Sequence, residues 1–183
     1  MREHKRDKMN NLTRKRVFSA LRVFVYAAYA AILLYALIFR QVKPSELFSP
    51  SREFFVRSVN LIPFATVEDK GALRSDILIQ LTIFAPLGFM LAMKSAGRQR
   101  RKLLLILPLL LSVFAEIMQY ALGVGVADIT DTICNSVGAA LGFFLYDIIS
   151  KAFGDSEKLN EACTLIMACV ACFVVVSFAV WLL

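Results

Sequence analysis

Histidine is almost absent from this sequence. The chain of 183 residues contains a single histidine, His4, which lies in the basic stretch at its start. Because a Ser-His-Asp triad needs an imidazole beside its nucleophile, no such catalytic set is available.

Cysteine is also scarce, with four residues in the chain. Cys169 and Cys172 form a C-x-x-C motif, which is a redox signature in some soluble proteins. Both lie in an apolar run, as do Cys134 and Cys163. In such surroundings a thiol behaves as a small hydrophobic group, and its thiolate form is disfavoured. The cysteines therefore predict neither a disulfide framework nor a redox or metal site.

Long apolar runs are abundant instead. The chain is 58% hydrophobic and has a mean hydropathy of +0.66, values typical of a membrane protein. A helix needs about 20 apolar residues to cross about 30 Å of hydrocarbon. The stretches that approach this length are 17–39, 76–93, 103–122, 132–149 and 162–183. Since backbone polar groups in lipid must be paired within each segment, we predict an all-α polytopic membrane bundle of about five transmembrane helices.

The basic residues indicate how the chain is oriented. Residues 1–16 carry seven Lys and Arg, residues 94–102 carry five, and residues 150–161 carry two. The much longer loop 40–75 carries six. By the positive-inside rule, this distribution favours a cytoplasmic N-terminus in a multi-pass protein of the plasma membrane. The net charge of +7 is then a topology signal, and without a binding motif no nucleic-acid partner is expected.

The same pattern divides the chain into parts. We expect a basic cytoplasmic tail (1–16), an uncleaved signal-anchor helix (17–39), an extracytoplasmic loop (40–75), a helical core (76–149) and a last transmembrane helix (162–183). Within the loop, the Ser- and Pro-containing segments 43–48 and 49–58 predict two short helices.

In this topology, three spans place polar side chains in the outer third of the bilayer. These residues are Asp76, Gln80, Glu116, Gln119, Asp128, Asp131 and Asn135. Glu116 is the strongest signal, because a carboxylate within a span costs about 2.5–3.5 kcal/mol and usually faces a cavity or a partner. We therefore predict an outer-leaflet polar site at which these side chains face one another.

The fourth span carries a stripe of polar and small residues. Asp128, Asp131, Asn135, Gly138 and Gly142 recur every three or four residues, which places them on one face of a helix. The two glycines would let another helix approach closely, so this face is expected to point into the bundle.

Simpler explanations stay open for several of these residues. Asp128 and Asp131 suit a helix N-terminus, and so does Asp76 after Ser75. Pro86 and Gly88 are explained by a bend in the second span alone.

Four motifs follow one another along residues 55–150. They are NLIPF (60–64), IFAPLGFML (83–91), AEIMQ (115–119) and DITDTICNSVGAALGFFLY (128–146). Together they resemble the VanZ-like family of small bacterial membrane proteins. The family takes its name from a protein that accompanies glycopeptide-resistance clusters and is linked to reduced teicoplanin susceptibility. The resemblance thus implies a cell-envelope association rather than a defined reaction.

Carried over position by position, the family pattern falls largely on residues already singled out. Its positions here are Asn60, Pro63, Phe64, Phe84, Pro86, Gly88, Glu116, Gln119, Asp128, Asp131, Asn135 and Gly138. The chain departs from the pattern at Gln80, where the family commonly has Asn, and at Thr130, where it commonly has an acidic residue. An Arg that often precedes the last motif is missing, so an anionic ligand would be harder to accommodate unless Arg52, Arg57 or Arg74 of the long loop substitutes for it.

Three interpretations of the polar site stay open. In the first, the site binds or shields a cell-envelope lipid, a lipid-linked cell-wall precursor or a lipoglycopeptide such as teicoplanin. In the second, Glu116, Asp128 and Asp131 hold a divalent cation, and the protein is an enzyme that acts on a lipid-linked headgroup. In the third, the polar residues only form a hydrogen-bond network between helices. We favour the first, with membrane lipids as partners and with no cofactor or resident metal.

Overall fold

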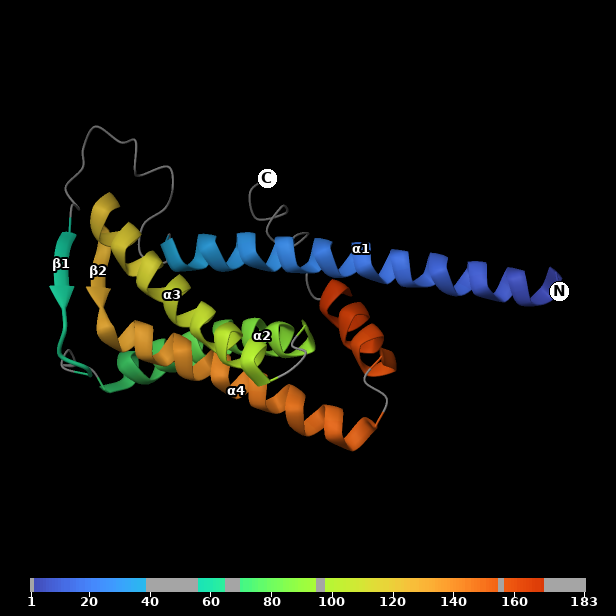
Figure 1. Ribbon diagram of the computed structural model, residues 1–183. Helices are drawn as coiled ribbons and strands as arrows, with labels where there is room; N and C mark the ends of the chain where they lie inside the picture. Colours follow the sequence, from blue (N-terminus) through green and yellow to red (C-terminus); the bar gives the residue numbers. More distant parts are fainter. Residues whose placement is uncertain (1, 39–55, 65–69, 95–97, 155–156, 170–183) are drawn as a thin grey trace. The chain divides into compact units, whose positions relative to one another are not determined.

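The computed structural model describes residues 2–38, 56–64, 70–94, 98–154 and 157–169. It has the predicted all-α architecture of a helical membrane protein (Figure 1). The elements are α1 (Arg2–Ile38), β1 (Val56–Asn60), α2 (Lys70–Lys94), α3 (Arg98–Leu122), β2 (Val124–Asp128) and α4 (Ile129–Phe153). A further helical segment occupies residues 157–169.

Four helices within the described residues are long and apolar enough to cross a membrane. The segments are Leu12–Ile38, Asp76–Lys94, Leu104–Leu122 and Ile129–Phe153. They coincide with the first four predicted spans. The predicted fifth span, 162–183, lies mostly outside the described residues, and so do the segment 43–48 and the motif residue Cys172.

Several helices begin earlier than the apolar runs within them. Helix α1 begins at Arg2, so the described part of the expected basic tail is helical and continuous with the first span. Helix α2 begins at Lys70, which places Asp76 in its second turn, so the explanation of Asp76 as a helix start is wrong. Lys and Arg are good helix formers, and a helix can therefore extend beyond the run that hydropathy detects.

The chain forms two compact units. One comprises residues 1–32 and 153–183, and the other comprises residues 33–152. In the first unit, ion pairs link α1 to the helical segment 157–169: Arg14 with Glu161, and Lys15 with Glu157. The second unit contains every residue of the predicted polar site.

The second unit also contains a pair of parallel strands that we did not predict. Strands β1 and β2 run side by side in the same direction, with Asn60 opposite Asp128 at their ends (Figure 1). The helix predicted over 49–58 is wrong for its described end, because residues 56–58 belong to β1. Both strands contain β-branched valines, which favour extended backbone. The pairing brings the NLIPF motif beside the start of α4.

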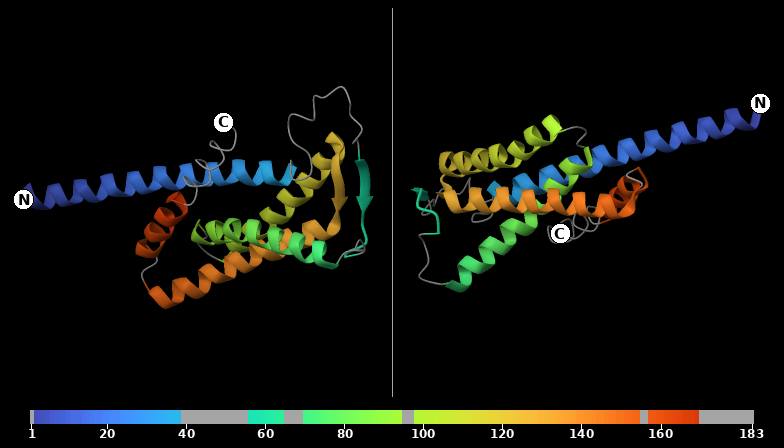
Figure 2. Two further views of the ribbon diagram at one scale, coloured as in Figure 1. Left: turned by 180° about the vertical axis from the view of Figure 1, so that it is seen from behind. Right: turned by 60° about the horizontal axis from the view of Figure 1, so that its bottom comes forward.

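Glycines allow α2 and α4 to cross in backbone contact (Figure 2). A Cβ atom on Gly88 would overlap the carbonyl oxygen of Ala139, and one on Gly142 would overlap that of Ala85. Gly138 is likewise buried against the backbone of α2. The prediction that the small residues of the fourth span admit another helix is confirmed. Pro86 lies between these contacts, within an α2 that continues to Lys94.

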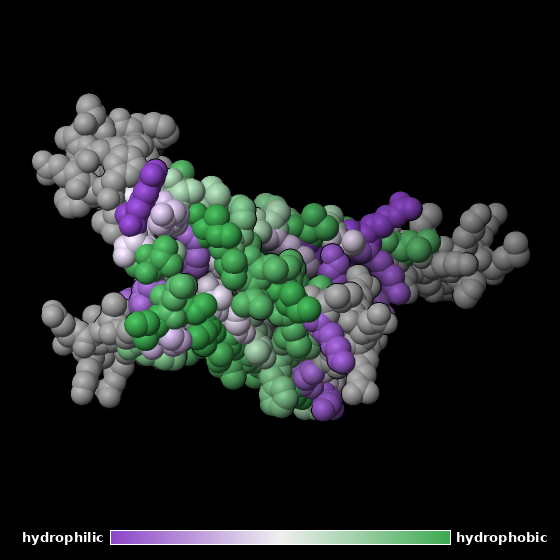
Figure 3. All heavy atoms as spheres, turned by 60° about the vertical axis from the view of Figure 1, so that its left-hand side comes forward, coloured by the Kyte–Doolittle hydropathy of each residue, from purple (hydrophilic) through white to green (hydrophobic). Residues whose placement is uncertain are grey.

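The outward faces of the helices in this unit carry large apolar side chains (Figure 3). On α3, Leu110 and Ile117 are each 59% exposed, and on α4 Phe144 is 66% exposed. Soluble proteins rarely expose contiguous apolar surfaces of this kind, whereas lipid tails solvate them at no cost. These faces are therefore suited to contact with lipid.

Candidate functional site

Asp128 caps helix α4. Its Oδ1 accepts a hydrogen bond from the backbone N–H of Thr130 (2.7 Å), and its Oδ2 accepts one from the side-chain nitrogen of Asn60 (3.1 Å). An Asp directly before the first helical residue satisfies an N–H group that has no partner within the helix. The explanation of Asp128 as a cap is therefore confirmed. Both of its carboxylate oxygens have donors from the protein.

The turn that follows β1 is tied to the same helix start. The Asn60 side-chain oxygen accepts the backbone N–H of Ile62 (3.1 Å), and the Thr130 hydroxyl accepts that of Phe64 (3.0 Å). Phe64 has a φ of 58°, a left-handed conformation that is rare for a bulky residue. Pro63 precedes it in the turn. Thr130, a departure from the family pattern, thus holds the end of the NLIPF motif in place.

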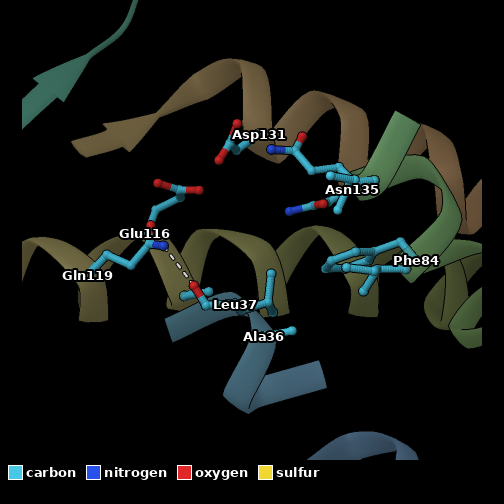
Figure 4. Close-up of a pocket in the computed structure, with 11 residues that line it drawn as sticks. Ala36, Leu37, Phe84, Glu116, Gln119, Asp131 and Asn135 are labelled. Carbon is cyan, nitrogen blue, oxygen red and sulfur yellow. Dashed lines mark hydrogen bonds between the residues drawn. The ribbon is translucent and has the colours of Figure 1, made fainter. Parts of the chain in front are cut away.

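Glu116 approaches this helix start from α3. Its Oε2 accepts the backbone N–H of Asp128 at 2.8 Å, and the side chain is half-buried. In Figure 4 the Glu116 carboxylate points toward the Asp131 side chain of α4, and both residues line the pocket described below. A carboxylate inside an apolar span is therefore placed against a backbone donor on one side and a cavity on the other.

The cavity lies among the last turn of α1 and helices α2, α3 and α4 (Figure 4). The empty space within it and at its open mouth is about 390 Å³. The centre of a water-sized group can occupy only about 20 Å³. This is room for one water molecule or one group of similar size. The residues that line it are Ala36, Leu37, Ile79, Gln80, Ile83, Phe84, Ala115, Glu116, Gln119, Asp131 and Asn135.

Three amide side chains from three helices are buried in the wall of this pocket. Gln80 of α2, Gln119 of α3 and Asn135 of α4 are 5%, 6% and 2% exposed. The Gln119 nitrogen donates to the carbonyl oxygen of Leu37 (2.7 Å), and the Asn135 nitrogen donates to the Ser112 hydroxyl (2.8 Å). Because a carbonyl only accepts, the first bond fixes which end of the Gln119 amide faces it. All three amide oxygens lack a hydrogen-bond partner among the described residues.

The structure thus separates the predicted polar residues into three groups. Those that line the pocket are Gln80, Glu116, Gln119, Asp131 and Asn135. Asn60 and Asp128 form the adjoining helix start, which the Asp128 N–H connects to Glu116. Asp76 is exposed and does not line the pocket. The site is therefore centred on the third and fourth spans, with Gln80 as the contribution of the second.

No cationic side chain is among the described residues that line the pocket. Arg57, one of the three possible substitutes for the missing family Arg, donates instead to the carbonyl of Ala121 in the last turn of α3 (3.4 Å). Arg52 and the side chain of Arg74 lie outside the described residues. The described wall of the pocket therefore combines two carboxylates with amide oxygens.

The described residues also bear on the metal interpretation. Within them, no group of three or more His, Cys, Asp and Glu side chains is arranged to hold a metal ion. Asp128 was the third ligand of that interpretation, and its oxygens are engaged by Thr130 and Asn60. Glu116 and Asp131 are left as the two carboxylates at the pocket.

Sequence reasoning missed two parts of the site. Ser112 was available from helical spacing, because it lies four residues before Glu116 and seven before Gln119 on α3. The role of the Leu37 carbonyl could not be predicted from the sequence, because any residue at the end of α1 would present a backbone carbonyl without a partner within the helix.

Comparison with known proteins supports the family resemblance that the motifs indicated. Residues 26–150 match the VanZ/LLP1 family. The chain is 32% identical over 138 residues to Protein VanZ of Enterococcus faecium, an alignment that covers 74% of this chain and 78% of that protein. No solved structure matches the chain.

Proposed function

This chain belongs to the VanZ/LLP1 family of membrane proteins, and from that premise we propose that it is a binding protein of the cell envelope. Its pocket takes up a small polar group of an envelope lipid, a lipid-linked wall precursor or a lipoglycopeptide. The protein spans the plasma membrane several times with this pocket toward the outer leaflet. By binding or shielding its ligand, it contributes to resistance to teicoplanin.

The observation that carries this proposal is the set of three buried amide oxygens without donors. A buried acceptor that loses its water without gaining a partner costs about 1–3 kcal/mol. Gln80, Gln119 and Asn135 each present such an oxygen, and all three line one pocket. A ligand that donates hydrogen bonds there would recover this cost, which is a favourable source of binding free energy.

The size of the pocket restricts how a ligand binds. Only a group about as large as water fits inside, so a lipid or glycopeptide would insert a single functional group. The remainder of the molecule would lie outside the pocket. A lipid tail is compatible with this arrangement, since α3 and α4 present exposed apolar faces.

The same observation argues against a purely structural network. Interhelical networks stabilise packing when their members are paired, whereas unpaired buried groups destabilise it. The Asn135–Ser112 bond is of the structural kind. The Gln80 oxygen, in contrast, has no described protein partner and contributes nothing to packing that an apolar side chain would not.

Substitution of the two pocket carboxylates tests the proposal. We compare teicoplanin tolerance of cells that produce the original protein, Glu116→Gln or Asp131→Asn. Glu116→Gln retains an oxygen that can accept the Asp128 N–H, so the variant is expected to fold. Both variants should lose the tolerance that the protein confers, and purified original protein should bind teicoplanin or a lipid-linked precursor saturably.

Asp76→Asn is the matched control, because Asp76 is an exposed carboxylate of α2 outside the pocket. It should leave tolerance unchanged. Equal effects of all three substitutions, or full tolerance in both pocket variants at normal protein levels, would refute the proposal.

A further inference from the structure

We infer that the group bound in this pocket is a primary ammonium, held by the amide oxygens of Gln80, Gln119 and Asn135 and by the charge of Glu116 and Asp131. This assignment rests on the proposed function, because it names the chemistry of the ligand at the same site.

The polarity of the pocket wall requires a ligand that donates. The three unpartnered atoms are all amide oxygens, which only accept hydrogen bonds. The two other polar residues of the wall are acidic, and none of the described residues that line the pocket is cationic. Phosphate, sulfate and carboxylate groups are acceptors with negative charge, so among the described residues they would meet two carboxylates and no positive partner. The wall therefore selects a cation or a neutral donor.

The number of acceptors matches an ammonium group. A primary ammonium carries three N–H donors and no acceptor. The pocket presents three buried oxygens that need a donor, one from each of three helices. Because α2, α3 and α4 contribute one oxygen each, a donor inside is approached from several directions. A single neutral hydroxyl has one donor and would leave two of the oxygens unsatisfied.

Charge favours the ammonium over a neutral amine. Glu116 and Asp131 line the same pocket from α3 and α4, and their carboxylates point toward each other (Figure 4). Two carboxylates at one pocket attract a positive charge, most strongly where water is excluded. Glu116 is held in place by the Asp128 N–H, so its carboxylate is oriented before any ligand enters.

Size distinguishes the ammonium from other cations. About 20 Å³ is available to the centre of a water-sized group, which excludes a quaternary ammonium with its methyl groups. Calcium takes six to eight oxygen ligands, and magnesium requires near-ideal octahedral geometry. Within the described residues, no group of three or more His, Cys, Asp and Glu side chains is arranged to hold a metal ion, and one oxygen of Glu116 already accepts the Asp128 N–H. An ammonium needs only three well-placed acceptors.

Thermal unfolding of the full-length protein in detergent tests the assignment directly. We titrate methylammonium chloride, and compare it with tetramethylammonium, sodium and calcium chloride at matched ionic strength. A ligand that binds the folded state raises Tm in proportion to the logarithm of its concentration above Kd. Methylammonium should raise Tm, and tetramethylammonium and sodium should not. A rise with calcium alone, or no rise with methylammonium, overturns the assignment.

The source of the ammonium is resolved in lipid bilayers. We reconstitute the protein in nanodiscs of phosphatidylethanolamine or of phosphatidylcholine with identical acyl chains. If the group belongs to a lipid headgroup, the ethanolamine lipid raises Tm and removes the response to methylammonium. If it belongs to a soluble amine or to teicoplanin, the response to methylammonium is equal in both lipids. Greater stabilisation by phosphatidylcholine overturns the assignment.

Gln80→Met separates a ligand site from a structural one. Methionine resembles glutamine in shape but removes the unpartnered oxygen. The variant should be at least as stable as the original protein without ligand, and its Tm should respond less to methylammonium. Asp76→Asn, one turn earlier on α2, should retain the full response. A destabilised Gln80→Met protein with an unchanged response overturns the assignment.

The two proposals fail in different ways. If methylammonium has no effect but Glu116→Gln still abolishes teicoplanin tolerance, the proposed function stands and the ammonium assignment is wrong. If methylammonium binds but tolerance is independent of the pocket residues, the site exists and its proposed role in resistance is wrong.

Discussion

The end of β2 offers a quantitative test of how the site is built. Asp128→Ala removes two hydrogen bonds, the cap on the Thr130 N–H (2.7 Å) and the acceptor of the Asn60 amide (3.1 Å). Loss of an N-cap costs about 1 kcal/mol, and loss of a hydrogen bond to a charged group costs about 1.5–3 kcal/mol. Because Asn60 is only half-buried, water can replace part of the second bond. We expect a destabilisation of about 2–4 kcal/mol.

Asp128→Asn separates the two bonds. Asparagine caps helices about as well as aspartate, so its one side-chain oxygen keeps the Thr130 bond, but its amide nitrogen then faces the Asn60 nitrogen and the Asn60 bond is lost. The expected cost is about 1–3 kcal/mol, which is smaller than that of Asp128→Ala by the contribution of the cap. Both variants are measured by chemical unfolding of the full-length protein in detergent. A double-mutant cycle with Asn60→Ala should give a coupling of about 1 kcal/mol between the two side chains.

Two results would refute this reasoning. Equal stability of Asp128→Ala and Asp128→Asn would mean that the cap contributes nothing. Loss of teicoplanin tolerance in Asp128→Asn at unchanged stability would mean that the Asp128 charge belongs to the ligand site and that its capping role is secondary.

Three further substitutions test other contacts of the fold. Gln119→Leu should be less stable than Gln80→Met by about 1–3 kcal/mol in unfolding measurements, because both remove an unpartnered oxygen but only Gln119→Leu leaves the Leu37 carbonyl without its donor; equal stability of the two variants would show that water reaches this carbonyl. Gly142→Leu should lower the yield of monodisperse protein sharply, since even a Cβ atom would overlap the backbone of α2, and normal yield would contradict this helix crossing. Glu157→Gln should change stability by less than about 1 kcal/mol, because its ion pair with Lys15 (3.0 Å) is exposed on both sides; a larger loss would mean that the pair is shielded from water.

The spans and the close contact of α2 with α4 could be predicted because they depend on simple sequence signals. Hydropathy locates the apolar core of each helix, and the spacing of Gly138 and Gly142 places both on one face. The direction of each span predicted that polar side chains from three helices would meet near the same end of the bundle. Gln80, Glu116 and Asn135 do line one pocket.

The parallel strands escaped prediction because their pairing is not local. Strand β1 is five residues long, and its partner β2 lies 68 positions further along the chain, as the register of Asn60 with Asp128 shows. Neither strand shows strict polar and apolar alternation, so periodicity gives no signal. Asp76 was predicted to face the polar site, but it is exposed and does not line the pocket. The direction of its side chain depends on the rotation of α2 about its axis, which the neighbouring residues in the sequence do not determine.

The strand pair connects the family motifs to the pocket in a single physical sequence. Register places Asn60 opposite Asp128, and the Asn60 bond together with the helix cap fixes the Asp128 side chain. With that residue fixed, its backbone N–H is directed at Glu116, whose carboxylate it orients into the pocket. Motifs far apart in sequence thus act on one carboxylate through backbone geometry. It follows that Asn60→Ala should weaken ligand binding, although Asn60 does not line the pocket. Asp76→Asn should leave ligand binding unchanged, although Asp76 belongs to α2, which contributes Gln80 to the pocket.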